Sequence, residues 1–313
     1  MKLIKRILEG DIRAAARLMS MIENRAPEAI SALKELYPHT GRAYVIGITG
    51  PPGSGKSTLV DQLTEAIRKR GKTVGIVAID PTSPFTGGAI LGDRIRMQRH
   101  STDPGVFIRS MATRGHLGGL APATNDVVDV LDAFGKEFIL IETVGVGQAE
   151  VEVVKAAHTS VIVTVPGLGD EVQVFKAGIL EIGDLFVVNK ADREGADRTA
   201  KELEVMLSFA PPKEGWKLKV YKTVATTGQG VPELLQGILE HLDYITVQGL
   251  KDWKWRERSE HVFLGLLKER LTCRILEKAS ENGALQDLMG KVTRRELDPY
   301  SATDEVLRRI GLT

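Results

Sequence analysis

The chain of 313 residues is 42% hydrophobic and 27% charged, with a formal net charge of +1, which is ordinary for a soluble globular protein. The near-neutral balance excludes a global basic field for nucleic acid, so we expect no nucleic-acid partner. A single cysteine excludes an intrachain disulfide, and every apolar run stops well short of the ~20 residues of a membrane span. We therefore expect a cytoplasmic protein without a membrane partner.

The predicted elements begin with a helical extension over residues 1–40, in which Asp11 is a suitable N-cap. Residues 41–248 alternate β-branched apolar runs with helix-like stretches. The strands are predicted at 43–50, 73–80, 105–110, 138–143, 159–165, 185–190 and 217–223, and the helices at 57–70, 123–134 and 198–209. This alternation predicts an α/β fold with a mostly parallel sheet covered by helices on both faces. Residues 249–313 are charged and predict a C-terminal helical extension, with Cys273 as a buried thiol.

A glycine-rich turn follows the first strand and precedes the first helix of the central region. It matches G-x-x-x-x-G-K-[ST], the pattern of P-loop NTPases, whose backbone N–H groups cradle phosphates. Lys56 is expected to reach the β- and γ-phosphates, and Ser57 to bind Mg²⁺ through its hydroxyl. The predicted phosphate-binding residues are Gly50, Pro51, Pro52, Gly53, Ser54, Gly55, Lys56, Ser57 and Thr58.

Acidic residues at predicted strand ends supply further ligands for Mg²⁺. Asp80 and Glu142 each end a buried-type strand, where open α/β sheets gather their ligands, and Asp93 is a third candidate. Glu142 begins an E-T-V-G element in which the N–H of Gly145 can sense the γ-phosphate, as in nucleotide switches. Gln148 is a candidate for positioning the attacking water. Capping and surface roles remain open for Asp80, Asp93 and Gln148.

The base is indicated by Asn189-Lys190-Ala191-Asp192, which follows another buried-type strand and resembles the N-K-x-D element of GTPases. The carboxylate of Asp192 can accept hydrogen bonds from guanine N1–H and the 2-amino group, two donors that adenine lacks. Lys190 is expected to lie along the base and Asn189 to brace the loop. Ala225 and Thr226 follow the next strand and resemble the last GTPase element, although Val224 replaces its usual serine.

Long blocks of the chain resemble the methylmalonyl-CoA mutase-associated GTPases (the MeaB/ArgK group). The blocks are GDIRAAARLMSMIEN, AIDPTSPFTGGAILGDRIRM, IETVGVGQAEVEV and GLGDEVQVFKAGILEIGDLFVVNKAD. The resemblance implies a SIMIBI-class GTPase that binds GTP/GDP and Mg²⁺. It implies a homodimer formed through the C-terminal arm and a role as chaperone of an adenosylcobalamin-dependent acyl-CoA mutase, whose cofactor loading it gates and which it protects. Residues 167–178 would form an additional switch that faces the mutase.

Three alternatives remain open at this point. A nickel-insertion GTPase would require Cys/His metal ligands, but the one cysteine and six histidines show no ligand spacing. A basic-amino-acid transport ATPase or kinase would prefer adenine or phosphorylate a small substrate. A structural GTP-binding module would lack useful turnover.

Overall fold

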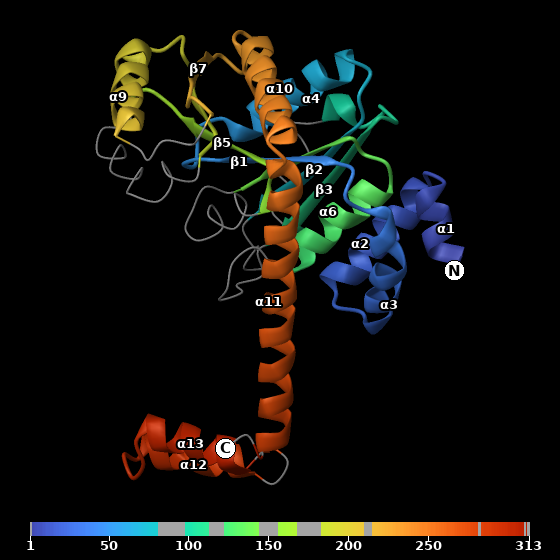
Figure 1. Ribbon diagram of the computed structural model, residues 1–313, viewed down its shortest axis with the longest axis vertical. Coiled ribbons are helices and arrows are strands. Elements are labelled where there is room, and N and C mark those ends of the chain that lie inside the picture. Colours follow the sequence, from blue (N-terminus) through green and yellow to red (C-terminus); the bar gives the residue numbers. More distant parts are fainter. Residues whose placement is uncertain are drawn as a thin grey trace. The chain divides into compact units, whose positions relative to one another are not determined.

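The computed structural model describes residues 2–80, 98–112, 122–143, 156–167, 183–209, 215–280, 283–309 and 311 (Figure 1). The chain divides into two compact units, Met1–Arg258 and Ser259–Thr313. The first unit contains the whole sheet, so it carries every described residue of the predicted nucleotide site.

One seven-stranded sheet organises the first unit, in the order β3-β2-β4-β1-β5-β6-β7 with every neighbouring pair parallel. Every residue of β1, β4, β5 and β6 is buried, as expected for strands covered on both faces. The strands are β1 (Tyr44–Thr49), β2 (Val74–Asp80), β3 (Val106–Ala112), β4 (Phe138–Glu142), β5 (Thr159–Thr164), β6 (Leu185–Asn189) and β7 (Val220–Thr223). The predicted parallel α/β fold is confirmed.

The last strand is shorter than its sequence pattern predicts. We expected it to start at residue 217, but β7 begins at Val220. It is the edge strand, and its one neighbour β6 offers Phe186 as the partner of Val220. Because β6 itself begins at Leu185, residues 217–219 have little strand beside them with which to pair.

Helices cover both faces of this sheet (Figure 1). On one face, α1 (Lys2–Leu8), α2 (Ile12–Glu23), α3 (Pro27–Leu36) and α6 (Pro122–Ala133) share a core with alternate strand residues such as Val45. On the other, α4 (Lys56–Lys69) and α10 (Val231–Val247) pack on the intervening residues, such as Ile46. A smaller cluster joins α9 (Ala196–Ser208) to β5 and β6. Asp11 caps α2 as predicted, since its Oδ1 accepts hydrogen bonds from the N–H groups of Arg13 and Ala14.

The C-terminal extension is helical, as expected, and consists of α11 (Leu250–Ser280), α12 (Ala284–Thr293) and α13 (Pro299–Arg309). Cys273 is exposed, so its prediction as a buried thiol was wrong. The apolar residues of this stretch indicated a core helix, whereas α11 exposes several of them, including Phe263, Leu264 and Leu271. Among the described helices, none has the length and apolar content needed to cross a membrane.

A buried histidine marks the amino-terminal edge of the sheet, just before β5. His158 is 4% exposed, and its Nδ1 accepts a hydrogen bond of 2.9 Å from the N–H of Val45. Its ring stacks on that of Tyr44, with the centroids 5.8 Å apart. Burial, with nearby lysine and arginine charges, lowers the pKa of His158 to about 3. The folded protein therefore holds this imidazole neutral.

Replacing this residue with a non-titrating acceptor (His158→Gln) should flatten the dependence of stability on pH. In the wild type, the unfolded chain takes up a proton at His158 below its ordinary pKa of 6.5 whereas the folded chain does not until about pH 3. Stability from this group is thus complete above pH 6.5 and falls as the pH drops below it, by about 2 kcal/mol at pH 5. Urea unfolding at pH 8 and pH 5 measures the difference. If the wild type and His158→Gln lose the same amount of unfolding free energy between pH 8 and pH 5, His158 is not the group responsible.

Candidate nucleotide-binding site

Polar residues end six of the seven described strands, at the carboxyl edge of the sheet. They are Thr49, Asp80, Glu142, Thr164, Asn189 and Thr223, the last residues of β1, β2, β4, β5, β6 and β7. Parallel strands place these ends at one edge, which is where open α/β sheets bind ligands. Each of them is a candidate picked out from the sequence or lies in the strand that precedes a candidate stretch. The predicted residues therefore gather at one edge of the fold.

The glycine-rich loop between β1 and α4 leaves no room for side chains at two points. Gly50 has a φ of 143°, and a Cβ there would clash with the carbonyl of Val163 on β5. Gly55 has a φ of 86°, and a Cβ there would clash with the side-chain amide of Asn189. Both positions accordingly require glycine. The loop is thus pressed against β5 and against the base-reading motif predicted from the sequence.

Lys56 closes the loop on itself. Its side chain is 6% exposed, and Nζ donates hydrogen bonds to the carbonyl oxygens of Gly50 at 2.8 Å and Pro51 at 3.0 Å. This ammonium group holds the loop curled around the start of α4. Phosphate oxygens could take the place of the two carbonyls, because they are stronger acceptors for a cation.

Ser54, in the same loop, contributes a buried hydroxyl. The residue is 1% exposed, and its Oγ has no hydrogen-bond partner among the described residues. Leaving such a group unsatisfied costs about 1–3 kcal/mol. A ligand with acceptor oxygens would remove that cost, so this observation fits a phosphate-binding loop.

Ser57 and Glu142 meet across the edge of the sheet. The Ser57 hydroxyl donates to Glu142 Oε1 at 2.6 Å, and both residues are buried. The residue after Glu142 fixes this strand end, since the Thr143 N–H donates to the Ile48 carbonyl and its hydroxyl to Thr49 Oγ1. Two hard oxygen donors in contact form a suitable part of a Mg²⁺ site. The sequence reasoning did not include Thr49 and Thr143, although both are polar residues beside the chosen strand ends.

Asn189 connects the glycine-rich loop to the loop after β7. Its Nδ2 donates to the Ser54 carbonyl at 2.8 Å, and its Oδ1 accepts from the Ala225 N–H at 3.1 Å. The same Oδ1 accepts from the Thr223 hydroxyl at 3.1 Å, a contact that sequence reasoning missed. All these amide contacts involve residues distant in the chain. Asn189 therefore braces the site, as its place in the N-K-x-D motif predicts.

Lys190 and Asp192 follow at the surface of the same edge. Lys190 has a positive φ of 56°, and its Nζ donates to the Gly53 carbonyl at 2.7 Å. Asp192 is exposed, and the preceding residue is fixed by a hydrogen bond from the Ala191 N–H to the Thr223 carbonyl. An exposed carboxylate on a fixed backbone is available to a ligand.

The loop of residues 224–229 closes on itself beside Asn189. The Val224 N–H donates to the Gln229 carbonyl at 2.9 Å, and the Gly228 N–H to the Val224 carbonyl. Ala225 is buried and Thr226 is exposed.

The remaining candidates, Asp93, Gly145 and Gln148, lie outside the described residues, as does most of the 167–178 stretch. Asp80 ends β2, in which Ala78 lies opposite Glu142 of β4.

The comparisons with known proteins identify the family. Residues 15–280 match the family model described as methylmalonyl Co-A mutase-associated GTPase MeaB. A Pyrococcus abyssi relative whose name refers to a GTPase is 53% identical over 312 residues, covering 99% of this chain and 96% of the relative. The chain belongs to the MeaB family of GTPases. It is accordingly a P-loop enzyme that binds guanine nucleotides and hydrolyses GTP, as the sequence predicted.

Two further relatives are less similar to this chain. The GTPase ArgK of Escherichia coli is 33% identical over 254 residues, covering 79% of this chain and 77% of the relative. The Caenorhabditis elegans protein named methylmalonic aciduria type A homolog, mitochondrial, is 33% identical over 289 residues, covering 83% and 72%. A crystal structure titled LAO/AO transport system kinase superposes with a TM-score of 0.75 at 21% identity, covering 99% and 97%. That last likeness supports the fold alone.

Proposed function

We propose that this MeaB-family GTPase is a chaperone of an adenosylcobalamin-dependent acyl-CoA mutase, and that GTP hydrolysis gates cofactor loading and protection of that enzyme. The observation that carries the proposal is the match of residues 15–280 to the mutase-associated family. The name of the C. elegans relative, which refers to methylmalonic aciduria, is consistent with it.

The site residues take definite roles in this proposal. Lys56 exchanges the Gly50 and Pro51 carbonyls for β- and γ-phosphate oxygens, and Ser54 donates its buried hydroxyl to phosphate. Ser57 and Glu142 are oxygen groups for Mg²⁺, which when bound would neutralise phosphate charge. Asp192 reads guanine N1–H and the 2-amino group. Water attack then needs little covalent help from the protein, so the residues act mainly by positioning and charge.

We further propose that the second unit forms a homodimer. Within that unit, α11 exposes Phe263 at 64%, Leu264 at 51% and Leu271 at 50%. Leu264, Leu267 and Leu271 follow the i, i+3, i+7 spacing of a helix-helix contact, and Leu267 is also exposed. A second copy of the same helix has a matching apolar face to cover them. Light scattering of the intact chain checks the mass.

Single-turnover GTP hydrolysis, measured with and without a purified adenosylcobalamin-dependent methylmalonyl-CoA mutase, tests the chaperone role. We expect slow intrinsic turnover that the mutase accelerates, because no described residue is assigned to position the attacking water. The hydrolysis rate of the Lys56→Ala variant, measured with and without the mutase, gives the background rate for each condition. The proposal is wrong if hydrolysis is equally fast with and without the methylmalonyl-CoA mutase and also with and without an isobutyryl-CoA mutase.

The alternatives are separated by nucleotide preference and metal binding. A transport ATPase or kinase would prefer ATP over GTP, so competition binding of the two nucleotides decides between them. Among the described residues, no three His, Cys, Asp or Glu side chains gather as a metal site. The nickel-insertion alternative therefore gains no support from this part of the chain.

A further inference from the structure

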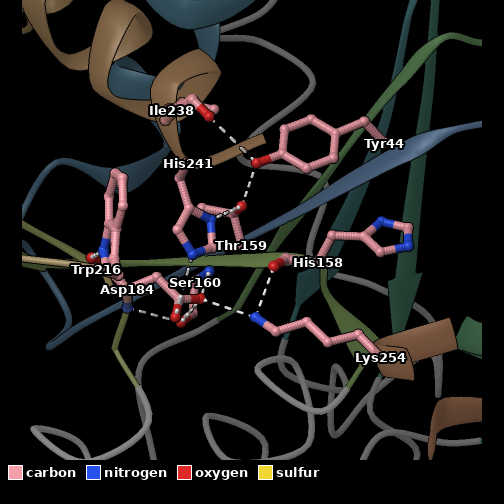
Figure 2. Close-up of polar contacts among 9 residues, drawn as sticks. All are labelled: Tyr44, His158, Thr159, Ser160, Asp184, Trp216, Ile238, His241 and Lys254. Atoms are coloured by element: carbon pink, nitrogen blue, oxygen red, sulfur yellow. Dashed lines mark hydrogen bonds and ion pairs between the residues drawn. The ribbon is translucent and has the colours of Figure 1, made fainter. Parts of the chain in front are cut away.

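A buried polar cluster (Figure 2) lies where β5 and β6 begin, at the amino-terminal edge of the sheet. The candidate nucleotide site lies at the opposite, carboxyl edge. At the centre of the cluster is Asp184, the residue before β6, which is 4% exposed. Its Oδ2 accepts hydrogen bonds of 2.9 Å from both the N–H and the hydroxyl of Ser160 on β5, and its carbonyl accepts one from Trp216 Nε1. His241 of α10 lies beside it, with Nε2 3.7 Å from Asp184 Oδ1, and meets the Thr159 hydroxyl through Nδ1 at 2.6 Å.

Lys254, near the start of α11, inserts its ammonium group into this cluster. Its Nζ donates to the His158 carbonyl at 2.7 Å and lies 3.4 Å from Asp184 Oδ2 (Figure 2). One cation thus joins the residue just before β5 to the residue just before β6. Because Asp184 is buried, this pairing is much less screened than a surface ion pair.

Two more contacts hold the same segment of α11 to the GTPase unit. The Trp255 ring stacks on His158, with the centroids 6.3 Å apart and the planes at 17°. The Arg258 guanidinium lies over the Trp255 ring, with Cζ 4.9 Å from the ring centroid, and its Nη2 donates to Asp129 Oδ1 on α6 at 2.8 Å. Arg258 is 7% exposed. Residues 250–258, which we call the arm root, are therefore anchored to β5, β6 and α6.

The position of the arm root along the chain gives these contacts a further meaning. The first compact unit ends at Arg258, so one continuous helix passes from the GTPase unit into the second unit directly after its anchors. In the sequence, His158 follows the stretch that holds Gly145 and Gln148, and Asp184 follows the predicted switch of residues 167–178. Lys254 contacts the residues at which both stretches lead into the sheet.

We propose that Lys254 is a positioning residue that couples the nucleotide state of the GTPase unit to the C-terminal arm. This inference rests on the expectation from the sequence that the element of Gly145 and the stretch 167–178 respond to the nucleotide. A shift of either the His158 carbonyl or the Asp184 carboxylate changes the acceptors of one ammonium group, and with them the arm root. Coupling of this kind is reciprocal, so the arm root must also bias the relative affinities for GTP and GDP.

Hydrogen exchange of the full chain, with GDP and with a non-hydrolysable GTP analogue in the presence of Mg²⁺, tests the coupling. We expect backbone amides of residues 259–280 to exchange at different rates in the two states. Lys254→Met should abolish that difference and change the ratio of the two nucleotide affinities by about 5-fold or more. Lys254→Arg should preserve both properties. Arg256→Met is the matched control, since Arg256 is exposed on the same turn of α11.

The results separate this inference from the chaperone proposal. Identical exchange of residues 259–280 with both nucleotides in the wild type would overturn the coupling, whether or not the mutase accelerates hydrolysis. A difference that persists in Lys254→Met would overturn the role of Lys254. If Lys254→Met does not fold, Arg258→Lys is measured instead, because lysine keeps the charge and weakens the contacts with the Trp255 ring and Asp129. A reduced nucleotide difference in Arg258→Lys supports coupling through the anchored arm root, and an unchanged one overturns the role of that anchoring.

Discussion

Lys56→Met is expected to lower GTP turnover by about 10³-fold or more while leaving the fold intact. In the structure, this ammonium group is buried and has carbonyl oxygens of Gly50 and Pro51 at 2.8 and 3.0 Å. These two carbonyl oxygens are weaker hydrogen-bond acceptors for the ammonium group than phosphate oxygens are. The negative charge on the phosphate oxygens also shifts during phosphoryl transfer. Methionine has a similar length and no charge, so the substitution removes the stabilisation and retains most of the packing.

Single-turnover hydrolysis with saturating GTP and Mg²⁺ measures the loss. Lys69→Met is the matched control: Lys69 lies on the same helix, its side chain is 73% exposed, and it pairs with Glu65 at the surface. That pair contributes about 0–1 kcal/mol, so the control should match the wild type in rate and in unfolding midpoint. A loss of less than tenfold in Lys56→Met would show that the loop amides and helix α4 carry the phosphate charge without this cation.

The sheet and the glycine-rich loop could be predicted because their signals are local. Strands that are buried on both faces read as unbroken apolar runs rich in β-branched residues. The run LFVVN at 185–189 is an example, in which Val187 and Val188 are fully buried, and β6 has the predicted start. The meeting of Ser57 and Glu142 also follows from sequence, since the loop after β1, which leads into α4, and the end of β4 lie at the same edge of a parallel sheet. For these features, position along a regular element determines position in space.

The contacts that hold the site together could not be predicted in the same way. Asn189 bonds to a carbonyl 135 residues earlier in the chain, and Lys254 to one 96 residues earlier. Neither partner is a distinctive residue type, because a main-chain carbonyl is present at every position. The prediction that Cys273 is buried was wrong for a related reason. A helix with an apolar face has the same sequence pattern whether that face is covered within the chain or left exposed.

Asp192→Asn is expected to weaken GTP binding by about 10²-fold and to favour xanthosine triphosphate. The carboxylate is exposed at the nucleotide edge, and the backbone beside it is fixed by the bond from the Ala191 N–H to the Thr223 carbonyl. Guanine offers it two donors, N1–H and the 2-amino group. Hydrogen bonds to a charged group contribute about 1.5–3 kcal/mol each. The asparagine side chain is uncharged, and its NH₂ group would face one of the two guanine donors without an acceptor. The total loss is therefore about 3 kcal/mol.

Xanthine makes this prediction specific, because it carries a carbonyl at the position of the 2-amino group. The amide N–H of the new asparagine can donate to that oxygen, whereas the carboxylate of the wild type repels it, so the preference should reverse instead of simply disappearing. Competition binding with GTP, xanthosine triphosphate and ATP measures the order. Asp197→Asn is the control, since Asp197 is exposed and pairs with Lys222 at the surface. An unchanged preference for GTP in Asp192→Asn would place base recognition elsewhere on this edge, because the asparagine leaves the supporting backbone bonds in place.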